Sequence, residues 1–521
     1  MNKQIRKYFK EQELTSIGNE IYKFKSLNVS KTVDNSNLIL VTSINPTPTG
    51  EGKTTTLIGI NDCLNYFNEK SLACLRQPSM GPFFGIKGGA TGSGKCALEN
   101  STLINCGFTG DFFAIESATN LIQACIENEI YQKSKLNINA KTIIWNRCID
   151  VNDRSLRDIE YLIDSKTKIK SKFNITAASY LMACFCLANS EDDLIDKINS
   201  TLIAFDFTNK PIYIKDLEIS NAIRLILTNA FRPNLVLSKY KNPVIIHGGP
   251  FANIAHGCNS IVATQLAMKK AKYVLTEAGF GADLGMEKFL NIKCRKMNVV
   301  PKLIVLAITL KSLKHHGGVP LNQLGEINFA KVEKGFSNVE KHIDSIKSFN
   351  LNFCIVINKF SNDSNKELVY LKNMILDKGY DCEISTMWQS GPSKNKSIHD
   401  LIIRNIKNND EINFSYDLES SPIEKMRQIA QKIYGANDII VSKKAINKLD
   451  KFSEYIKDYY ICFAKNFFSV TSNPKKLGWP KNFKISITDI EINHSSKFII
   501  PIAGTIFLMP GLPKTPNAKT I

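Results

Sequence analysis

Paired cysteines, long apolar runs and basic clusters interleaved with aromatic residues are all missing from this sequence. Its 13 cysteines include no C-x-x-C pair, so we expect a reducing compartment and neither a disulfide framework nor structural zinc. The first residues have no apolar core, which argues against a secretory signal. The most apolar stretches are residues 177–188, which are too few to span a bilayer, and residues 498–508, which Pro501 and Gly504 interrupt. We therefore predict a cytoplasmic protein without a membrane partner.

The overall composition is that of a soluble globular protein, with 43% hydrophobic and 22% charged residues. A chain of 521 residues is too long for one core, so we expect about two to four domains. The formal charge of +19 suggests a P-loop ATPase that nucleic acid stimulates, but it is equally compatible with a basic pocket for small polyanions. The lysines are scattered, and an ATPase of that kind would leave several glycine-rich blocks without a role. We therefore predict no nucleic-acid partner.

The stretch from Leu38 to Leu57, LILVTSINPTPTGEGKTTTL, has the layout of a phosphate-binding loop. Its apolar start predicts a buried strand, and Gly-Lys-Thr-Thr opens a helix-like segment. Gly50 and Gly52 allow backbone N–H groups to point at an anion, which the N-terminus of the helix also attracts. Lys53 can reach the outer phosphates of a nucleotide, and the Thr54 hydroxyl can ligate Mg²⁺. The predicted ATP-binding residues are Thr47, Pro48, Thr49, Gly50, Glu51, Gly52, Lys53 and Thr54.

This loop departs from the usual pattern at Thr47, because the standard motif has Gly six residues before the lysine. Pro46 and Pro48 stiffen the turn instead, since each fixes its own φ angle. The alternative is an ordinary strand-to-helix turn that happens to contain Gly-Lys-Thr. The preceding strand favours the phosphate loop.

A second predicted strand, residues 72–75, ends at Arg76 and completes a βαβ unit, which implies a parallel sheet. Ligands of such sheets lie beyond the carboxyl ends of the strands, where both the loop and Arg76 fall. Arg76 can bind a carboxylate or phosphate through two parallel hydrogen bonds, and a surface salt bridge is the alternative. The long glycine-rich segment 77–94 that follows is typical of a functional loop. The predicted fold class is therefore α/β, with a P-loop NTPase-like parallel sheet.

Two later blocks carry further candidates. His247-Gly-Gly-Pro follows a predicted strand and precedes a predicted helix over residues 251–267, so it is a second candidate anion site. A buried, hydrogen-bonded side chain is the alternative for His247 and the favoured interpretation of His256 on the helix. Residues 277–285 hold three glycines and two carboxylates, which are costly to order unless the backbone must approach something closely.

Phe360 and Trp388 each follow a short predicted strand, residues 352–357 and 385–387. They are candidates for an aromatic clamp around a flat ring. Core packing is the alternative for each residue taken alone.

Ten blocks occur in one order along the chain: PTPTGEGKTTT, RQPSMGPFFGIKGG, FTGDF, NDRSLR, HGGPFANIAHGCNS, TEAGFGADLGMEKF, IKCRK, LKHHGG, INKF and PGLPKTP. From about residue 10 to residue 516 the chain closely resembles the formate–tetrahydrofolate ligase family. The resemblance implies a homotetramer of three-domain α/β subunits. The implied domains are a nucleotide domain of residues 1–90 and 250–335, an inserted α/β domain of residues 91–249, and a C-terminal α/β domain of residues 336–521 that contributes the folate pocket.

The resemblance also implies a reaction, in which ATP converts formate to formyl phosphate. The amine of tetrahydrofolate then attacks it, giving 10-formyltetrahydrofolate, ADP and phosphate, with help from a monovalent cation. On this basis Lys53, with Mg²⁺ near Thr54, would neutralise the phosphates, and Arg76 would hold formate and then formyl phosphate. His247 would lie near the intermediate. The pterin ring would lie between Phe360 and Trp388.

Several positions depart from the family pattern. Gln77 replaces the usual Glu after the arginine, Gly107 and Phe113 replace two histidines, and Lys311 replaces an Arg. Losing two imidazoles near the intermediate can remove acid–base help, which is typically about a hundredfold to ten-thousandfold in rate. The alternative function is therefore a weak relative that binds ATP and folate without efficient turnover. The intact blocks around His247 and Glu277 favour an active ligase.

Overall fold

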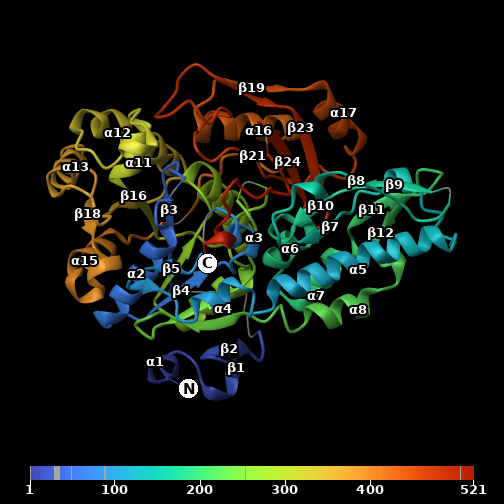
Figure 1. Ribbon diagram of the computed structural model, residues 1–521, viewed down its shortest axis with the longest axis horizontal. Helices are drawn as coiled ribbons and strands as arrows, with labels where there is room; N and C mark the ends of the chain where they lie inside the picture. The colour runs from blue at the N-terminus through green and yellow to red at the C-terminus, as the bar shows by residue number, and fades with distance from the viewer. Residues whose placement is uncertain are drawn as a thin grey trace.

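The computed structural model describes residues 2–27, 36–48, 50–86, 90–165, 167–252, 254–409, 411–504 and 506–520. In this part of the chain the largest sheet has ten strands (Figure 1). Their order is β1 (Leu14–Gly18), β2 (Ile21–Phe24), β13 (Asn234–Leu237), β14 (Pro243–Ile246), β4 (Ser71–Leu75), β15 (Tyr273–Glu277), β3 (Asn37–Ser43), β16 (Leu303–Ile308), β17 (Phe353–Asn358) and β18 (Cys382–Ser385). From β14 to β18 every neighbouring pair is parallel, so these strands end at one common edge.

Both faces of the sheet are buried, and successive side chains of a strand contribute to opposite faces. In β3, Ile39 and Val41 belong to one core, and Leu38 and Leu40 belong to the other. Parallel sheets of this kind are covered by helices on both faces. The first face packs against α2 (Lys53–Tyr66) and α15 (Lys396–Asn405), and the second against α9 (Ile261–Lys270) and α12 (Phe329–Ser348).

A helical region lies between β6 and β13, at the right of Figure 1. Its core contains fully buried residues such as Ile115, Phe185 and Ile223. The helices are α5 (Asp111–Tyr131), α6 (Tyr180–Leu187), α7 (Glu191–Asn199) and α8 (Ser220–Leu227). The short strand pairs are β7 (Arg147–Ile149) with β10 (Phe173–Ile175), β8 (Ile159–Leu162) with β9 (Lys168–Ser171), and β11 (Leu202–Phe205) with β12 (Pro211–Tyr213).

We call residues 422–503 the C-terminal unit, which lies above the central sheet in Figure 1. Its apolar residues join the same core cluster as the second face of the sheet, so the unit packs firmly on it. The elements are α16 (Pro422–Ile429), β19 (Asp438–Val441), α17 (Lys443–Lys451), β20 (Tyr460–Ile461), β21 (Ala464–Lys465), β22 (Lys484–Ile487), β23 (Asp489–Asn493) and β24 (Phe498–Ala503).

Further α-helices complete the described chain together with one short strand pair and several 3₁₀ and π turns. These helices and strands are α1 (Lys3–Arg6), α3 (Met80–Phe84), β5 (Gly92–Ser93), β6 (Cys96–Ala97), α4 (Ser101–Asn105), α10 (Arg295–Met297), α11 (Leu310–His316), α13 (Asn365–Asp377) and α14 (Met387–Ser390). No helix within the described ranges is both long enough and apolar enough to cross a lipid bilayer.

The predicted α/β class with a parallel sheet is confirmed. The helix predicted over residues 251–267 is wrong in its first half, because α9 begins only at Ile261, where the Ser260 hydroxyl accepts a hydrogen bond from the Ala263 N–H. Upstream, the Phe251 N–H donates to Ala177 O, and Cys258 pairs with Ala278. Apart from one turn in which the Ala255 N–H donates to Phe251 O, these backbone bonds therefore join the segment to its neighbours.

The three-domain division remains a prediction. The central sheet takes strands from all three predicted parts, since β14 pairs with β4, and β17 pairs with β16. This pairing brings the ends of strands that are far apart in the sequence to one edge of the sheet.

Candidate functional site

The predicted phosphate loop connects β3 to α2 at the carboxyl edge of the sheet. Gly52 stands just before the helix with a φ of 68°, a left-handed conformation that favours glycine. A Cβ at Gly52 would lie 2.4 Å from the Asn358 amide nitrogen, so the position also requires glycine for space. At Gly50 a Cβ would meet nothing within 4 Å, which leaves the outer side of the loop open to a ligand. Thr49 lies outside the described residues.

Glu51 connects the loop to neighbouring parts of the protein through hydrogen bonds. Its side chain is only 2% exposed and accepts hydrogen bonds from the Thr47 N–H at 2.9 Å and the Thr309 hydroxyl at 2.6 Å. Its backbone carbonyl accepts a third bond from the Asn358 amide at 3.2 Å. The loop is thus held by the first residues beyond β16 and by the last residue of β17, the strands that follow β3 in the sheet. Glu51 therefore stabilises the loop through both its side chain and its backbone carbonyl.

Lys53 and Thr54, the first residues of α2, contact groups at the ends of neighbouring strands. The Lys53 ammonium donates to the Ser43 hydroxyl at 3.2 Å, and the Thr54 hydroxyl donates to the Glu277 carboxylate at 2.8 Å. Burial lowers the pKa of Lys53, and the carboxylates of Glu277 and Glu51 partly oppose that shift. An incoming anion would offset the same loss of solvation, so the geometry favours phosphate here.

Arg76 follows β4, which is separated from β3 by β15. Its guanidinium lies 3.8 Å from the carboxylate of Glu277, the last residue of β15, and donates to Pro250 O at 3.2 Å. The buried Nε atom has no hydrogen-bond partner among the described residues, so the group keeps donor capacity for a ligand. A Cβ at Gly279 would lie 3.0 Å from Arg76 Nη1, so the missing side chain leaves room for the guanidinium.

Lys53, Arg76 and Glu277 therefore form one charged cluster at the edge of the sheet. The two cations suit a phosphate and a small carboxylate held side by side. The hydroxyl of Thr54 and the carboxylate of Glu277 are hard oxygen donors of the kind Mg²⁺ prefers. Mg²⁺ usually takes one or two protein ligands together with substrate phosphates and water, so this pair fits that ion. Among the described residues, no group of three or more His, Cys, Asp or Glu side chains is arranged to hold a metal.

His247 follows β14 and is completely buried. Its Nδ1 lies 2.6 Å from the Ser260 hydroxyl, and its Nε2 lies 2.9 Å from Ala230 O. Burial lowers the pKa of His247 to about 4, although the carboxylate of Asp111 favours the charged form. In the neutral ring, each of the two nitrogens therefore has a hydrogen-bond partner within the protein. This geometry matches the alternative of a buried, hydrogen-bonded histidine and leaves no nitrogen directed at a ligand.

The predicted clamp residues lie beyond β17 and β18. Phe360 and Trp388 are both half-buried, and the Trp388 indole donates to Lys359 O at 2.6 Å. The Lys311 ammonium lies 4.6 Å from the centre of the Phe360 ring. The β5–β6 hairpin covers Trp388, because the Lys95 N–H donates to Trp388 O at 2.8 Å and a Cβ at Gly94 would collide with the same carbonyl. The glycine-rich segment after Arg76 thereby connects the two halves of the site.

Three of the departures from the family pattern differ in their surroundings. The buried Gln77 amide donates to Ile104 O at 2.7 Å and accepts from the Thr109 hydroxyl at 2.7 Å, so it braces the loop before α5. Gly107 lies in that loop, and a Cβ there would meet nothing within 4 Å. Phe113 is 77% exposed. Gln77 therefore has a structural partner for each end of its amide, whereas Phe113 points to solvent.

Sequence reasoning missed three residues that shape the site. Glu277 belongs to the glycine-rich block 277–285, and its position at a strand end is the signal that marks it as a site residue. Thr309 and Asn358 also lie at strand ends, but their contacts with Glu51 join parts of the chain that no local pattern connects.

Comparison with known proteins shows the family of this chain. The family model described as formate–tetrahydrofolate ligase matches residues 4–521. A formate–tetrahydrofolate ligase of Malacoplasma penetrans strain HF-2 is 55% identical over 526 aligned residues, covering 100% of this chain and 98% of the relative. The formate–tetrahydrofolate ligase of Ureaplasma parvum serovar 3 is 46% identical over 505 residues, covering 96% of this chain and 95% of the relative. This chain belongs to the formate–tetrahydrofolate ligase family.

Proposed function

We propose that this chain ligates formate to tetrahydrofolate with ATP, giving 10-formyltetrahydrofolate, ADP and phosphate. Membership of the family supports the overall reaction. The observation that carries the proposal is the charged cluster of Lys53, Arg76 and Glu277, which offers two cations beside one carboxylate at the phosphate loop. No observation favours the alternative of a weak, nucleotide-binding relative.

In the first half of the proposed reaction, a formate oxygen attacks the γ-phosphorus of ATP in line. The bond from phosphorus to the leaving ADP oxygen breaks, and formyl phosphate forms. Such transfers depend on positioning and on neutralising charge. Lys53 would contact the phosphates, with the loop residues Thr47, Pro48, Gly50 and Gly52 around them. Arg76 would hold formate through the donor capacity that the protein leaves free.

In the second half, the amine of tetrahydrofolate adds to the formyl carbon and forms a tetrahedral species. The carbon–oxygen bond to phosphate then breaks, and the amine loses its proton. Phe360 and Trp388 would hold the pterin ring between their faces, with the Lys311 ammonium beside the Phe360 ring. For His247 we propose a positioning role, since its two hydrogen bonds join the end of β14 to Ser260 and Ala230.

Ions and assembly belong to the proposal through family membership. Mg²⁺ bound to ATP would use the oxygen donors of Thr54 and Glu277, and it would supply additional charge neutralisation on the phosphates. A monovalent cation, a homotetramer and a cytoplasmic location are expected from the same membership. We propose no nucleic-acid or membrane partner, because the proposed substrates are small anions.

The proposal predicts ADP release that requires both formate and tetrahydrofolate. The test is a coupled assay of ADP and of 10-formyltetrahydrofolate, with each substrate omitted in turn. Lys53→Ala should lower the rate by about a hundredfold to a thousandfold, because one pre-positioned cation at the transferring phosphate is lost. The control is Lys378→Ala, since Lys378 is an exposed lysine paired with Glu340 just beyond α13.

Unchanged activity in Lys53→Ala would overturn the proposed site. Tight ATP binding by the parent protein without any formate-dependent ADP would overturn the proposed reaction and favour the weak relative.

A further inference from the structure

Asn45, at the start of the phosphate loop, is hydrogen-bonded to four other residues. Its side-chain amide donates to Asp283 at 3.1 Å and to Phe467 O at 3.3 Å. Its side-chain oxygen accepts from the Asn338 amide at 3.0 Å, and its backbone carbonyl lies 2.9 Å from His316 Nε2. Asn45 is completely buried, so protein partners alone satisfy its side-chain amide and its backbone carbonyl.

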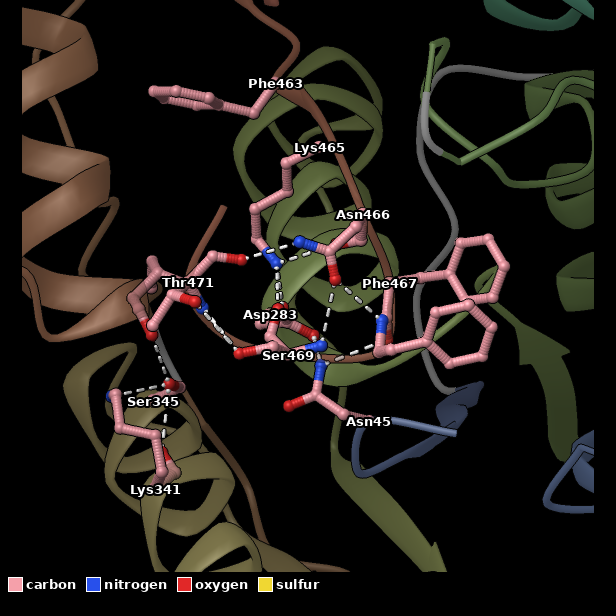
Figure 2. Close-up of polar contacts among 12 residues, drawn as sticks. Asn45, Asp283, Lys341, Ser345, Phe463, Lys465, Asn466, Phe467, Ser469 and Thr471 are labelled. Carbon is pink, nitrogen blue, oxygen red and sulfur yellow. Dashed lines mark hydrogen bonds and ion pairs between the residues drawn. The ribbon is translucent and has the colours of Figure 1, made fainter. Parts of the chain in front are cut away.

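Asp283 holds the amide of Asn45 and is itself held by Lys465. The Lys465 ammonium lies 2.7 Å from the Asp283 carboxylate, and both side chains are 0% exposed (Figure 2). Asp283 lies on a π-helical turn, Ala282–Met286, that follows the end of β15. Such turns are rare and frequently occur at functional sites. A carboxyl group buried this deeply stays ionised only when a cation or several hydrogen-bond donors compensate its charge.

Lys465 belongs to the C-terminal unit and ends β21. Besides Asp283 it donates to Asn466 O at 3.1 Å and to Ser469 O at 2.6 Å, so the surrounding turn is wrapped around the ammonium (Figure 2). The next residues continue the contact, because the Phe467 ring stacks on the Phe280 ring with 4.2 Å between the ring centres. The C-terminal unit therefore contacts the phosphate loop through one buried chain of groups.

The charge of Asp283 acts on the nucleotide site as well. The Asp283 carboxylate favours the charged form of Lys53, and the Lys465 ammonium helps to hold the pKa of Asp283 below its usual range although burial would raise it. Without Lys465, the site would contain an uncompensated carboxylate beside the proposed triphosphate position. That charge would repel the ligand, and its side chain would no longer be held for Asn45.

We propose that Lys465 is a positioning residue for the nucleotide. It neutralises Asp283 and keeps that carboxylate aimed at Asn45, and it thereby lets the C-terminal unit set the geometry of the phosphate loop. The inference rests on the proposed nucleotide site.

The test compares Lys465→Met with the double variant Lys465→Met, Asp283→Asn, in the full-length protein. ADP affinity is measured by calorimetric titration, and the KM for ATP and kcat are measured in the complete reaction. Lys465→Met should weaken ADP binding at least about tenfold and raise the KM for ATP, because the carboxylate is left unpaired. The double variant should recover most of that affinity, since the amide that replaces the Asp283 carboxylate carries no charge and can still accept a hydrogen bond from Asn45.

Lys425→Met is the matched control. Lys425 is also a fully buried lysine of the C-terminal unit, but among the described residues it donates only to Lys457 O and Tyr459 O, both at 3.1 Å. It should lower thermal stability and leave ADP affinity within about twofold of the parent at temperatures where the protein is folded. If Lys465 had only a structural role, Lys465→Met should give the same result as Lys425→Met.

The inference fails if folded Lys465→Met binds ADP as the parent does, or if Lys425→Met weakens ADP equally. If Lys465→Met does not fold, the double variant decides: near-parental ADP affinity supports the inference, and affinity as weak as that of Lys53→Ala overturns it. If the parent itself binds no ADP, the proposed nucleotide site fails, which is a different outcome.

Discussion

The position of the Arg76 guanidinium depends on the absence of a Cβ atom at Gly279. Gly279 lies two residues beyond β15, and an added Cβ would lie 3.0 Å from Arg76 Nη1 and 2.8 Å from Ala252 Cβ. Both distances are shorter than ordinary contacts, so either Arg76 or the backbone would have to move. The position of the guanidinium is therefore set by packing as much as by its ion pair with Glu277.

Gly279→Ala should raise the KM for formate by about tenfold or more, because displacing a positioned guanidinium weakens a charge-assisted contact. Overpacking should also cost about 1–3 kcal/mol in the free energy of unfolding. ADP affinity without formate should change little, since Lys53 is not touched. Steady-state kinetics with formate as the varied substrate and calorimetry with ADP separate the two effects.

Gly325→Ala serves as the control, because a Cβ there would meet nothing within 4 Å. An unchanged KM for formate in Gly279→Ala would show that Arg76 does not bind this substrate.

At this scale the sequence predicts the positions of some residues better than those of others. The loop motif places Lys53 at a helix start, and a strand end places Arg76 nearby, so local patterns suffice. The environment of His247 could not be predicted, because Ser260 and Ala230 are distant in sequence and only the fold brings both to the ring. Whether a histidine is a ligand or a buried packing residue depends on such partners.

At the scale of elements, the short helix α11 spans the phosphate loop from one end to the other. Thr309, its N-cap, donates to Glu51 near the end of the loop, and its hydroxyl also accepts from the Ser312 N–H at 3.1 Å. His316, its last residue, bonds Asn45 at the start of the loop. A displacement of this helix would therefore move both ends of the loop.

Thr309→Val removes the cap and the bond to Glu51 while keeping the shape of the side chain. Loss of a cap costs about 0.5–2 kcal/mol, and leaving Glu51 without this donor adds about 1–3 kcal/mol. We expect lower stability in urea titrations together with weaker ADP binding, because the loop would lose one of its supports. Thr309→Ser keeps the hydroxyl and should preserve the ADP affinity. If Thr309→Val bound ADP as tightly as Thr309→Ser and the parent do, α11 would not support the loop.

The strands of the sheet could be predicted because each is a short apolar run next to a turn, and the predicted strand over residues 72–75 lies within β4. The error over residues 251–267 arose where apolar and small residues resemble a helix but bond to other segments. Ser260 was the available signal, since a serine before an apolar run is a typical helix cap.

At the scale of the whole molecule, the site is assembled from residues of the entire chain. Lys465 lies 182 residues after Asp283, and their contact supports the residue at which the loop begins, Asn45. No periodicity or motif connects these positions, because the connection depends on how the C-terminal unit packs on the sheet. This is why the sequence predicts the nucleotide loop and not its support.

The whole molecule also contains two sets of buried groups that respond to pH in opposite directions. Burial lowers the pKa of His247 and His316 to about 4. Below pH 6.5 these two histidines therefore bind more protons in the unfolded chain than in the folded chain. Burial raises the pKa of Asp62 and Asp150 to about 7, so below that pH the folded chain binds more protons at these groups than the unfolded chain. Acidification thus destabilises the fold through the histidines and stabilises it through the carboxyl groups. We expect the net dependence between pH 7 and 5 to be shallow.

Replacing one histidine should reveal its contribution to the pH dependence of the free energy of unfolding. In His247→Gln the amide can still bond Ser260 and Ala230, but it cannot take up a proton in the unfolded state. Since the depressed pKa makes stability fall as pH drops below 6.5, the variant should gain about 2 kcal/mol relative to the parent between pH 7 and pH 5. The free energy of unfolding from urea titrations at both pH values measures this difference. His494→Gln should shift in the same direction, because burial lowers the pKa of His494 to about 4 as well. A difference between variant and parent that stays constant from pH 7 to pH 5 would mean that His247 is protonated as readily in the folded chain as in the unfolded one.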